Sequence, residues 1–356
     1  MRVTLEDVCE KVVSMTGEYP IYGAAGYIGN VDFYHQEKPY VAIVKDGAGI
    51  GRTTLHPAKS SVIGTMQYLL PKDNVLPEYL YYVIRHMHLE KYFTGATIPH
   101  IYFRDYKNEN FNLDSLDKQA EIVEILEKAE LVILKRRQQL AELDNLIKAR
   151  FVELFGTLHN NGNGFDVVTI EDVCSLIKDG THQTPQYTDD KETGYKFLSS
   201  KDVMSQKIDW TDIKYIPAEL HKKLYATIKP QRNDILMSKN GVNYGIAAVN
   251  DTDEVFDIYV SLALLRPKEL IAPVFFRCAI NNPETKRQFD SSIKGIGVPN
   301  LHLGEIKKTK IFLPPMELQK EFVSFVEQSD KSKVAIQKAL DETQLLFDSL
   351  MQKYFG

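Results

Sequence analysis

Two turns of this sequence combine a lysine and a glycine directly after an apolar run. Lys45-Asp46-Gly47 follows the run at residues 39–44, and Lys239-Asn240-Gly241 follows the run at residues 234–237. A cation at a strand end, with glycine two positions later, allows a charged side chain and the backbone to approach a phosphate group together. The residues that these turns offer as phosphate contacts are Lys45, Arg52, Lys239, Asn240 and Tyr244. The alternative is an ordinary hairpin turn whose lysine is solvated.

A second set of candidates carries hydroxyl, imidazole, amino or phenol groups in segments with little hydrophobic periodicity. Its members are Tyr22, His35, Thr181, His182, Thr184 and Lys201. Such groups suit hydrogen bonds to base edges or to phosphates. The alternative for His182 is an exposed loop side chain without a ligand. The neighbouring Tyr27 is expected to lie in the core.

No arrangement of residues typical of catalysis stands out. The phosphate-binding loop G-x-x-x-x-G-K-[ST] of ATP-driven motors does not occur. Residues 47–52 are rich in glycine, but they lack the spacing and following helix pattern of a dinucleotide loop, so we expect a turn between two strands. Residues 281–284 match an amino-methyltransferase motif only in part, and Glu305-Ile306-Lys307 lacks the partner acid of a nuclease metal site. We therefore expect a chain that is not an enzyme by itself and that holds no metal.

The sequence contains the same domain twice. Residues 3–9 return as residues 168–174 with six of seven letters unchanged, and residues 95–126 match residues 295–326. The offset grows from 165 at the opening block to 194 at the Lys-x-Gly turns and 200 from Gly95 onward. The length difference therefore falls mainly in residues 10–40 of the first copy and 175–234 of the second. A repeat of this length predicts two copies of a whole domain that keep a framework and vary their early interior.

Each copy is expected to be a mixed α/β globule followed by one long helix. Residues 4–7 resemble a capping box at a helix start, and shorter helices are expected to begin at Pro77 and Pro273. Residues 180–230 are rich in turn formers and are expected to form mostly loops and short strands. The expected strands are residues 39–44, 66–70, 234–237, 246–249 and 260–264.

The two long helices carry a heptad pattern of apolar residues. Its seam includes Leu126, Ile133, Arg136, Leu140, Leu143, Ile147, Val326, Ile336, Leu340 and Phe347. An apolar stripe on a helix about 60 Å long must be buried, and two repeats related by a pseudo-two-fold axis predict an antiparallel pair. The alternative is two separate helices, each packed on its own globule. Arg136 in the seam would either bond the partner helix and fix its register, or mark the docking site of another protein.

Composition places few further limits on function. The chain has 356 residues, three cysteines and a formal net charge of −5. The acidic balance counts mildly against nucleic-acid binding, since phosphates favour basic surfaces. Cys9 and Cys174 are expected to be buried thiols rather than metal ligands or a disulfide. No apolar stretch approaches the ~18 to 20 residues of a membrane span, and we expect a cytoplasmic protein without a membrane partner.

Two variable globules that alternate with two long helices resemble the specificity (S) subunit of type I restriction-modification enzymes. Residues 19–29 followed by 44–51 look like one common type of target recognition domain, and residues 180–187 with 197–203 look like another. Leu313-Pro314-Pro315-Met316-Glu317-Leu318-Gln319 is a typical entry to the second helix. Its counterpart at residues 113–119 lacks the two prolines. The resemblance covers essentially the whole chain and implies an α+β fold, in which two similar recognition domains are joined by two long antiparallel coiled-coil helices.

The resemblance also implies a division of labour. Residues 1–115 and 157–315 would be the target recognition domains, each reading one half of a bipartite, asymmetric site in double-stranded DNA. Residues 116–156 and 316–356 would be the helices that set the spacing and dock two methyltransferase subunits, through which restriction subunits join. This chain would carry no cofactor, and the partner subunits would bind S-adenosylmethionine, ATP and Mg²⁺. The alternatives are a type IIB-like specificity subunit and a coiled-coil adaptor that does not bind DNA.

Overall fold

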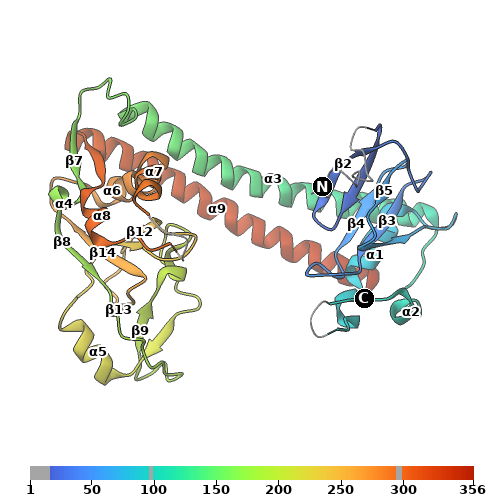
Figure 1. Ribbon diagram of the computed structural model, residues 1–356. Coiled ribbons are helices and arrows are strands. Elements are labelled where there is room, and N and C mark those ends of the chain that lie inside the picture. The colour runs from blue at the N-terminus through green and yellow to red at the C-terminus, as the bar shows by residue number, and fades with distance from the viewer. Residues whose placement is uncertain (1–16, 96–98, 294–298) are drawn as a thin grey trace, which may run out of the picture. The chain divides into compact units, whose positions relative to one another are not determined.

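The computed structural model describes residues 17–95, 99–293 and 299–356 (Figure 1). The chain divides into two compact units. Unit 1 comprises residues 1–138 and 337–356, and unit 2 comprises residues 139–336. Each unit therefore combines one globule with a part of both long helices. Mixed helix and sheet in each globule confirm the expected α+β class.

The described residues of the unit 1 globule form two small sheets and three short helical segments. One sheet has the order β2-β1-β5, with β1 (Tyr19–Gly23), β2 (Gly26–Val31) and β5 (Ser61–Val62). The other has the order β4-β3-β6, with β3 (Tyr40–Val44), β4 (Thr53–His56) and β6 (Met66–Leu69). Then follow α1 (Pro77–His86), the 3-10 helix η1 (Leu89–Tyr92) and α2 (Phe103–Tyr106). All five residues of β3 are buried, as its unbroken apolar run predicts.

The globule of unit 2 has more elements around a similar pair of sheets. The order β10-β9-β13 joins β9 (Tyr195–Leu198), β10 (Lys214–Ile216) and β13 (Phe256–Ile258). The order β12-β11-β14-β8 joins β8 (Cys174–Asp179), β11 (Ile235–Ser238), β12 (Ala247–Val249) and β14 (Leu262–Pro267). A two-stranded sheet pairs β7 (Asp166–Thr169) with β15 (Lys310–Leu313). The helices are α4 (Ile170–Val173), η2 (Ser200–Val203), α5 (Ala218–Tyr225), α6 (Pro273–Ile280), α7 (Pro283–Ser292) and α8 (Leu303–Lys308).

The two globules share strand order and register, so the sequence repeat is a repeat of topology. Val41 lies opposite Leu55 on β4 and Leu69 on β6. Its counterpart Ile235 lies opposite Val249 and Leu265. The variable interiors agree as well, because β1 and β9 each pair with one antiparallel and one parallel strand. The extra length of unit 2 therefore lies in insertions between common strands, including η2 and α5.

Some local expectations need correction or fall outside the described residues. α5 is a helix within residues 180–230, where the composition predicts mostly loops and short strands, and β14 begins at Leu262 rather than at residue 260. The capping box expected at residues 4–7 lies outside the described residues. At its counterpart, Thr169 Oγ1 accepts a hydrogen bond from Asp172 N, and Asp172 Oδ2 accepts one from Thr169 N. Helix α4 therefore starts as the repeated motif predicts.

The long helices are α3 (Leu116–Phe155) and α9 (Met316–Phe355), each 40 residues long. They lie side by side within each unit (Figure 1). In unit 2, Arg150 bonds Glu321 at 3.0 Å and Lys333 pairs with Asp144 at 2.6 Å. Residue numbers thus rise along α3 as they fall along α9, and the pair is antiparallel, as expected.

The expected seam positions face inward along both helices. Buried members are Leu126, Ile133, Ile147, Val326, Leu340 and Phe347, and partly buried ones are Arg136, Leu140, Leu143 and Ile336. Arg136 Nη1 donates to the carbonyl oxygen of Ala339 and to Thr343 Oγ1, both within unit 1. Of its two expected roles, these bonds favour fixing the register of the helix pair.

Each long helix is also fastened to a globule by the same side chains. Gln119 Oε1 accepts a hydrogen bond from Leu76 N at 2.9 Å, and Gln319 Oε1 accepts one from Ala272 N at 2.8 Å. Both glutamines are fully buried, and each donates to two backbone carbonyls. Because Leu76 and Ala272 precede α1 and α6, these contacts hold the start of a globule helix against a long helix.

Candidate nucleic-acid interface

The two Lys-x-Gly turns have the same backbone partners. Gly47 N donates to the carbonyl oxygen of Pro99 at 3.0 Å, and Gly241 N donates to that of Pro299 at 3.0 Å. The lysine before each glycine accepts a bond at 2.9 Å from Ile101 N in unit 1 and from Leu301 N in unit 2. Gly47 and Gly241 have φ values of 92° and 84°, a region that favours glycine. Each turn is therefore fixed by a distant segment and is more than a local hairpin.

The side chains of the two turns differ. Lys45 is partly exposed, and its Nζ lies 2.5 Å from Asp46 Oδ2, while Asp46 Oδ1 lies 2.7 Å from His100 Nδ1. Burial alone would raise the pKa of Asp46, but the hydrogen bonds from Lys45 and His100 lower it below the ordinary value. Asp46 is thus a carboxylate that holds Lys45 at the surface.

In unit 2 the equivalent lysine is inside the protein. Lys239 is only 3% exposed and forms an ion pair with Asp179 of β8. Asn240 is partly buried, and its Oδ1 has no hydrogen-bond partner among the described residues. Tyr244 is also buried; its hydroxyl donates to Asp290, and the Lys286 ammonium lies 3.5 Å from its ring centroid. These buried or partly buried side chains therefore stabilise the turn from inside the protein.

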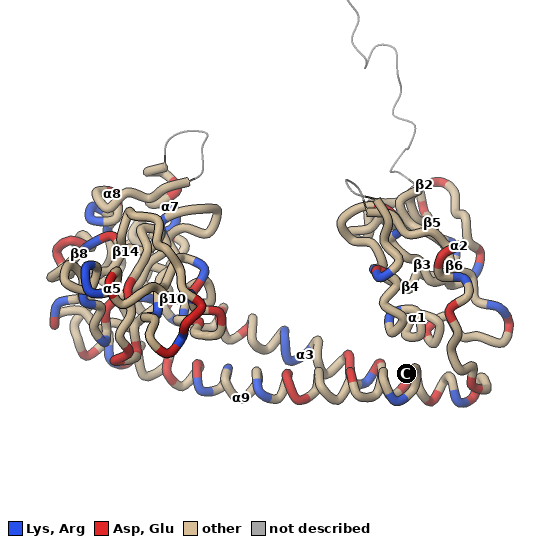
Figure 2. Tube along the Cα trace, turned by 90° about the horizontal axis from the view of Figure 1, so that it is seen from below, with Lys and Arg blue, Asp and Glu red and all other residues tan. Residues whose placement is uncertain are grey.

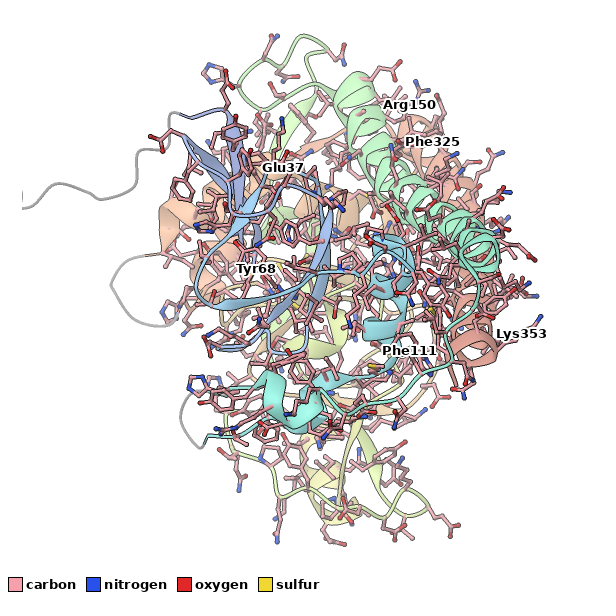
Figure 3. All side chains as sticks on the ribbon, turned by 90° about the vertical axis from the view of Figure 1, so that its right-hand side faces the viewer. Glu37, Tyr68, Phe111, Arg150, Phe325 and Lys353 are labelled. Carbon is pink, nitrogen blue, oxygen red and sulfur yellow. The ribbon has the colours of Figure 1, made fainter. Side chains whose placement is uncertain are left out.

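The other unit 1 candidates lie near aromatic side chains, of which Tyr27, Phe33 and His35 are exposed. The expectation that Tyr27 belongs to the core is wrong, because its side chain is 63% exposed. The rings of Phe33 and His35 lie 5.1 Å apart, and His35 Nδ1 is 3.2 Å from the hydroxyl of Tyr68, which Figure 3 labels. Tyr22 is partly buried beneath Tyr27, with ring centroids 6.0 Å apart.

Arg52 occupies the far end of the turn that begins at Lys45. Its side chain is exposed, and Nη1 donates to the carbonyl oxygen of Ala24 at 2.8 Å. Residues 47–51 form a turn between the antiparallel strands β3 and β4, as their glycine spacing predicts. Arg52 therefore joins this turn to the β1–β2 hairpin, and its exposed guanidinium has further N–H groups that can donate to an anion.

The candidate loop of unit 2 is anchored at one end and open at the other. Thr181 N donates to the carbonyl oxygen of Ile258 at 3.0 Å, and Val260 N donates to that of Thr181 at 3.0 Å. A Cβ at Gly180 would lie 2.3 Å from the carbonyl oxygens of Ile258 and Tyr259, so only glycine fits there. His182 and Thr184, which follow, are exposed. A rigid start and open side chains suit a loop that contacts another molecule.

Asp179 brings together two residues that the sequence selects separately. It pairs with the buried Lys239, and its Oδ2 lies 3.6 Å from Nε2 of the exposed His182. Sequence reasoning missed Asp179, because no local pattern links it to Lys239. Lys201 lies elsewhere, on η2, where its ammonium pairs with Asp212 at 2.8 Å and with Asp202 at 3.2 Å.

Charge is interspersed over the globules, as Figure 2 shows by the mixture of basic and acidic residues. This distribution favours local contacts over a broad basic stripe. The described residues contain no group of three or more His, Cys, Asp or Glu side chains placed to hold a metal ion. Among them there is also no helix long and apolar enough to cross a membrane.

Comparison with known proteins gives a consistent family. A family model described as "Type I restriction modification DNA specificity domain" matches residues 2–145 and 163–343. The chain is similar to the specificity subunit of type I restriction enzyme EcoBI of Escherichia coli, at 26% identity over 172 residues, 47% of this chain and 36% of that protein. It is also similar to the specificity subunit of MjaIX of Methanocaldococcus jannaschii, at 21% identity over 308 residues, 80% of this chain and 69% of that protein. The first match thus spans about a third of its relative's length.

Solved structures share the fold. The S subunit of a type I restriction-modification system from M. genitalium has a TM-score of 0.55 at 16% identity, covering 100% of this chain and 92% of that chain. A chain from a study of complex assembly and conformational transition in a type I restriction-modification system has a TM-score of 0.55 at 15% identity, covering 94% and 90%.

Proposed function

Since this chain belongs to the family of type I restriction modification DNA specificity domains, we propose that it is the DNA-recognition and scaffold subunit of a type I restriction-modification complex. By itself it carries out no reaction. One observation supports two-part recognition most strongly: the globules share strand order and register but differ in the insertions between strands. A common framework with different loops suits two unlike half-sites in one asymmetric DNA target.

In this proposal the exposed candidate residues of each unit make the contacts with DNA. In unit 1, Lys45 and Arg52 bind phosphates, while His35 and Tyr22 contact bases or sugars. In unit 2, His182 and Thr184 read base edges, Thr181 positions their loop, and Lys201 binds phosphate. Lys239, Asn240 and Tyr244 act through the shape of their turn, because their side chains are buried or partly buried.

The long helices set the spacing of the half-sites and dock the partners. Leu134 and Val334 are equivalent positions on α3 and α9, and they are 62% and 63% exposed. Leu146 and Leu346 are a second equivalent pair, 49% and 55% exposed. Apolar residues that recur outside the seam suit two copies of one partner. Two methyltransferase subunits bind here, and restriction subunits join through them.

Chemistry and cofactors belong to the partners in this proposal. The methyltransferase subunits use S-adenosylmethionine to modify adenine within the recognised site, and the restriction subunits use ATP and Mg²⁺. The chain works where these subunits meet chromosomal DNA, in the cytoplasm.

Co-expression with a cognate methyltransferase subunit tests the proposal. The two proteins should co-purify, and sequencing for N6-methyladenine should find modified adenines only in one split, asymmetric motif. Failure to co-purify, together with unmodified DNA, would reject the scaffold role and favour an adaptor that does not bind DNA.

A further inference from the structure

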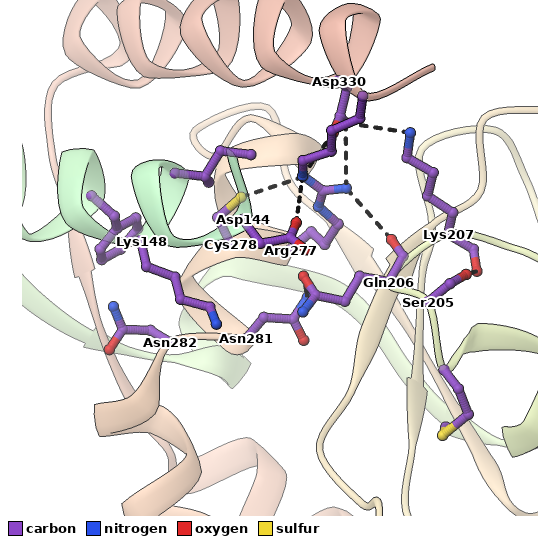
Figure 4. A pocket seen from close by; sticks show the side chains of 14 residues that line it. Asp144, Lys148, Ser205, Gln206, Lys207, Arg277, Cys278, Asn281, Asn282 and Asp330 are labelled. Atoms are coloured by element: carbon purple, nitrogen blue, oxygen red, sulfur yellow. Dashed lines mark hydrogen bonds and ion pairs between the residues drawn. The ribbon is translucent and has the colours of Figure 1, made fainter. Parts of the chain in front are cut away.

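Unit 2 contains a polar cavity of about 250 Å³ between its globule and its long helices (Figure 4). Four segments form the walls. α3 contributes Asp144 and Lys148, and α9 contributes Asp330 and Lys333. The loop at residues 204–207 contributes Lys207, and α6 with the turn after it contributes Arg277, Cys278, Asn281 and Asn282. All of these residues belong to the same unit.

Arg277 is the most unusual member of the cavity wall. Its residue is only 8% exposed, and its Nε has no hydrogen-bond partner among the described residues. The other guanidinium contacts are long: 3.4 Å to the carbonyl oxygen of Gln206, 3.5 Å to Cys278 Sγ and 4.0 Å to Asp330 Oδ2. Burial raises the pKa of Cys278, so its thiol is neutral. A buried guanidinium with an unbonded Nε and such long contacts can donate to a further hydrogen-bond partner.

The cavity carries more positive than negative side chains. Arg277, Lys148, Lys207 and Lys333 face only two carboxylates, those of Asp144 and Asp330. Asp330 is shared by Arg277, by Lys207 at 3.7 Å and by Lys333 at 3.3 Å, and Asp144 pairs with Lys333 at 2.6 Å. Lys148 has no ion-pair partner among the described residues. In Figure 4 its side chain points toward Asn281.

The corresponding place in unit 1 has different side chains and shorter contacts. Tyr82 stands where unit 2 has Cys278, and its hydroxyl donates to Glu130, the counterpart of Asp330, at 2.8 Å. Arg85 stands where unit 2 has Asn281, and it forms an ion pair with Glu130. One arginine and one carboxylate thus compensate each other there. The cavity of unit 2 is therefore a local feature and not a consequence of the repeated framework.

From the buried Arg277, the surplus of cations and the side-chain amide of Asn282 in the wall, we infer that this cavity binds a small oxyanion. The ligand class is a phosphate-like or carboxylate group that bonds Arg277 Nε and Lys148 together. A bound anion would fasten the loop at residues 204–207 and α6 to α3 and α9. It would thereby stiffen the attachment of the second globule to its helices.

Calorimetric titration of the full chain with inorganic phosphate, sulfate and acetate at constant ionic strength tests this inference. We expect saturable binding of one ion with a parallel rise in the melting temperature, and the three anions distinguish tetrahedral from carboxylate ligands. Lys148→Met should weaken binding roughly tenfold, about the loss of one charge-assisted hydrogen bond. Arg277→Met should abolish it. Lys320→Met removes an exposed lysine of α9 outside the cavity and should leave binding unchanged.

Asp330→Asn separates ligand binding from a purely structural role. Removal of a carboxylate that competes for three cations should strengthen anion binding severalfold, although it breaks native ion pairs. Absence of saturable binding in the unsubstituted chain would overturn the inference. Equal affinity in the Lys148→Met and Lys320→Met variants would also overturn it, even if Arg277→Met fails to fold.

Discussion

Lys45 and Lys239 lie at equivalent positions of the two repeats and have the same backbone hydrogen bonds, but their side chains differ in exposure and in acidic partner. Lys45 is partly exposed and held by the adjacent Asp46, whereas Lys239 is buried against Asp179. Asp179 ends β8, whose sequence counterpart in unit 1 lies outside the described residues. The comparison shows that the framework fixes where a turn lies, while the acidic partner of the lysine decides whether its side chain lies at the surface or inside the protein.

Substitution of the two lysines should give the largest difference between the units, in the free energy of unfolding. Lys239→Met leaves Asp179 without its buried partner and should lower the free energy of unfolding by about 3 kcal/mol. Lys45→Met should cost less than about 1 kcal/mol, but it should reduce the salt dependence of DNA binding by about one phosphate contact. Chemical denaturation and binding at several salt concentrations measure both effects. Equal stability losses would contradict the assignment of a structural role to Lys239 and a surface role to Lys45.

The second largest difference should appear on acidification, which should destabilise unit 1 more than unit 2. Burial lowers the pKa of His56 in β4 to about 4, and its counterpart in unit 2 is Asn250, which does not titrate. The unfolded chain takes up a proton near pH 6.5, so the stability that His56 contributes is present above that pH and is lost as the pH falls toward 4. The slope should be about 1.4 kcal/mol per pH unit.

The single tryptophan makes this difference measurable. Trp210 belongs to unit 2, so its fluorescence follows that unit, while circular dichroism follows both. Between pH 6.5 and 4 the unfolding seen by circular dichroism should shift more than the fluorescence transition. His56→Asn should remove the excess shift. An unchanged shift in this variant would show that other groups cause the acid sensitivity.

The buried glutamines should behave alike in both units. Gln119→Ala and Gln319→Ala each leave a helix-start N–H and two carbonyl groups without partners. We expect each to lower the free energy of unfolding by about 2 kcal/mol. Gln328→Ala on the exposed surface of α9 is the matched control and should change stability little. A loss confined to one of the buried pair would show that the two fastenings are not equivalent.

The smallest effect on stability should come from the exposed apolar positions on the long helices. Leu134→Glu and Val334→Glu should each change the free energy of unfolding by less than about 0.5 kcal/mol. Each should nevertheless reduce the number of methyltransferase copies in the purified complex from two to one, as native mass spectrometry would show. Lys135→Glu, also on the surface of α3, is the control. Retention of both copies in both variants would place the docking surface elsewhere.

Most of the framework follows from local sequence patterns. The heptads predict α3 and α9, prolines mark the starts of α1 and α6, and unbroken apolar runs mark β3 and β11. The sequence does not predict α5, because its eight residues lie in a segment rich in turn formers. A distant contact holds it: His221 Nδ1 lies 2.6 Å from Asp257 Oδ2, 36 residues away.

The site was less predictable, because accessibility depends on such distant contacts. Nothing near Lys239 in the sequence indicates that Asp179 will bury it, and nothing near Tyr27 indicates that the β1–β2 hairpin leaves it exposed.

Methylation mapping of two matched variants tests most directly whether each unit reads its own half-site. One complex would carry His35→Ala with Arg52→Ala in unit 1, and the other His182→Ala with Thr184→Ala in unit 2. Sequencing for N6-methyladenine should show relaxed specificity in one half of the split motif for the first complex and in the opposite half for the second, with the gap unchanged. Relaxation of the same half by both variants, or a continuous motif in the unsubstituted complex, would contradict separate reading by the two units.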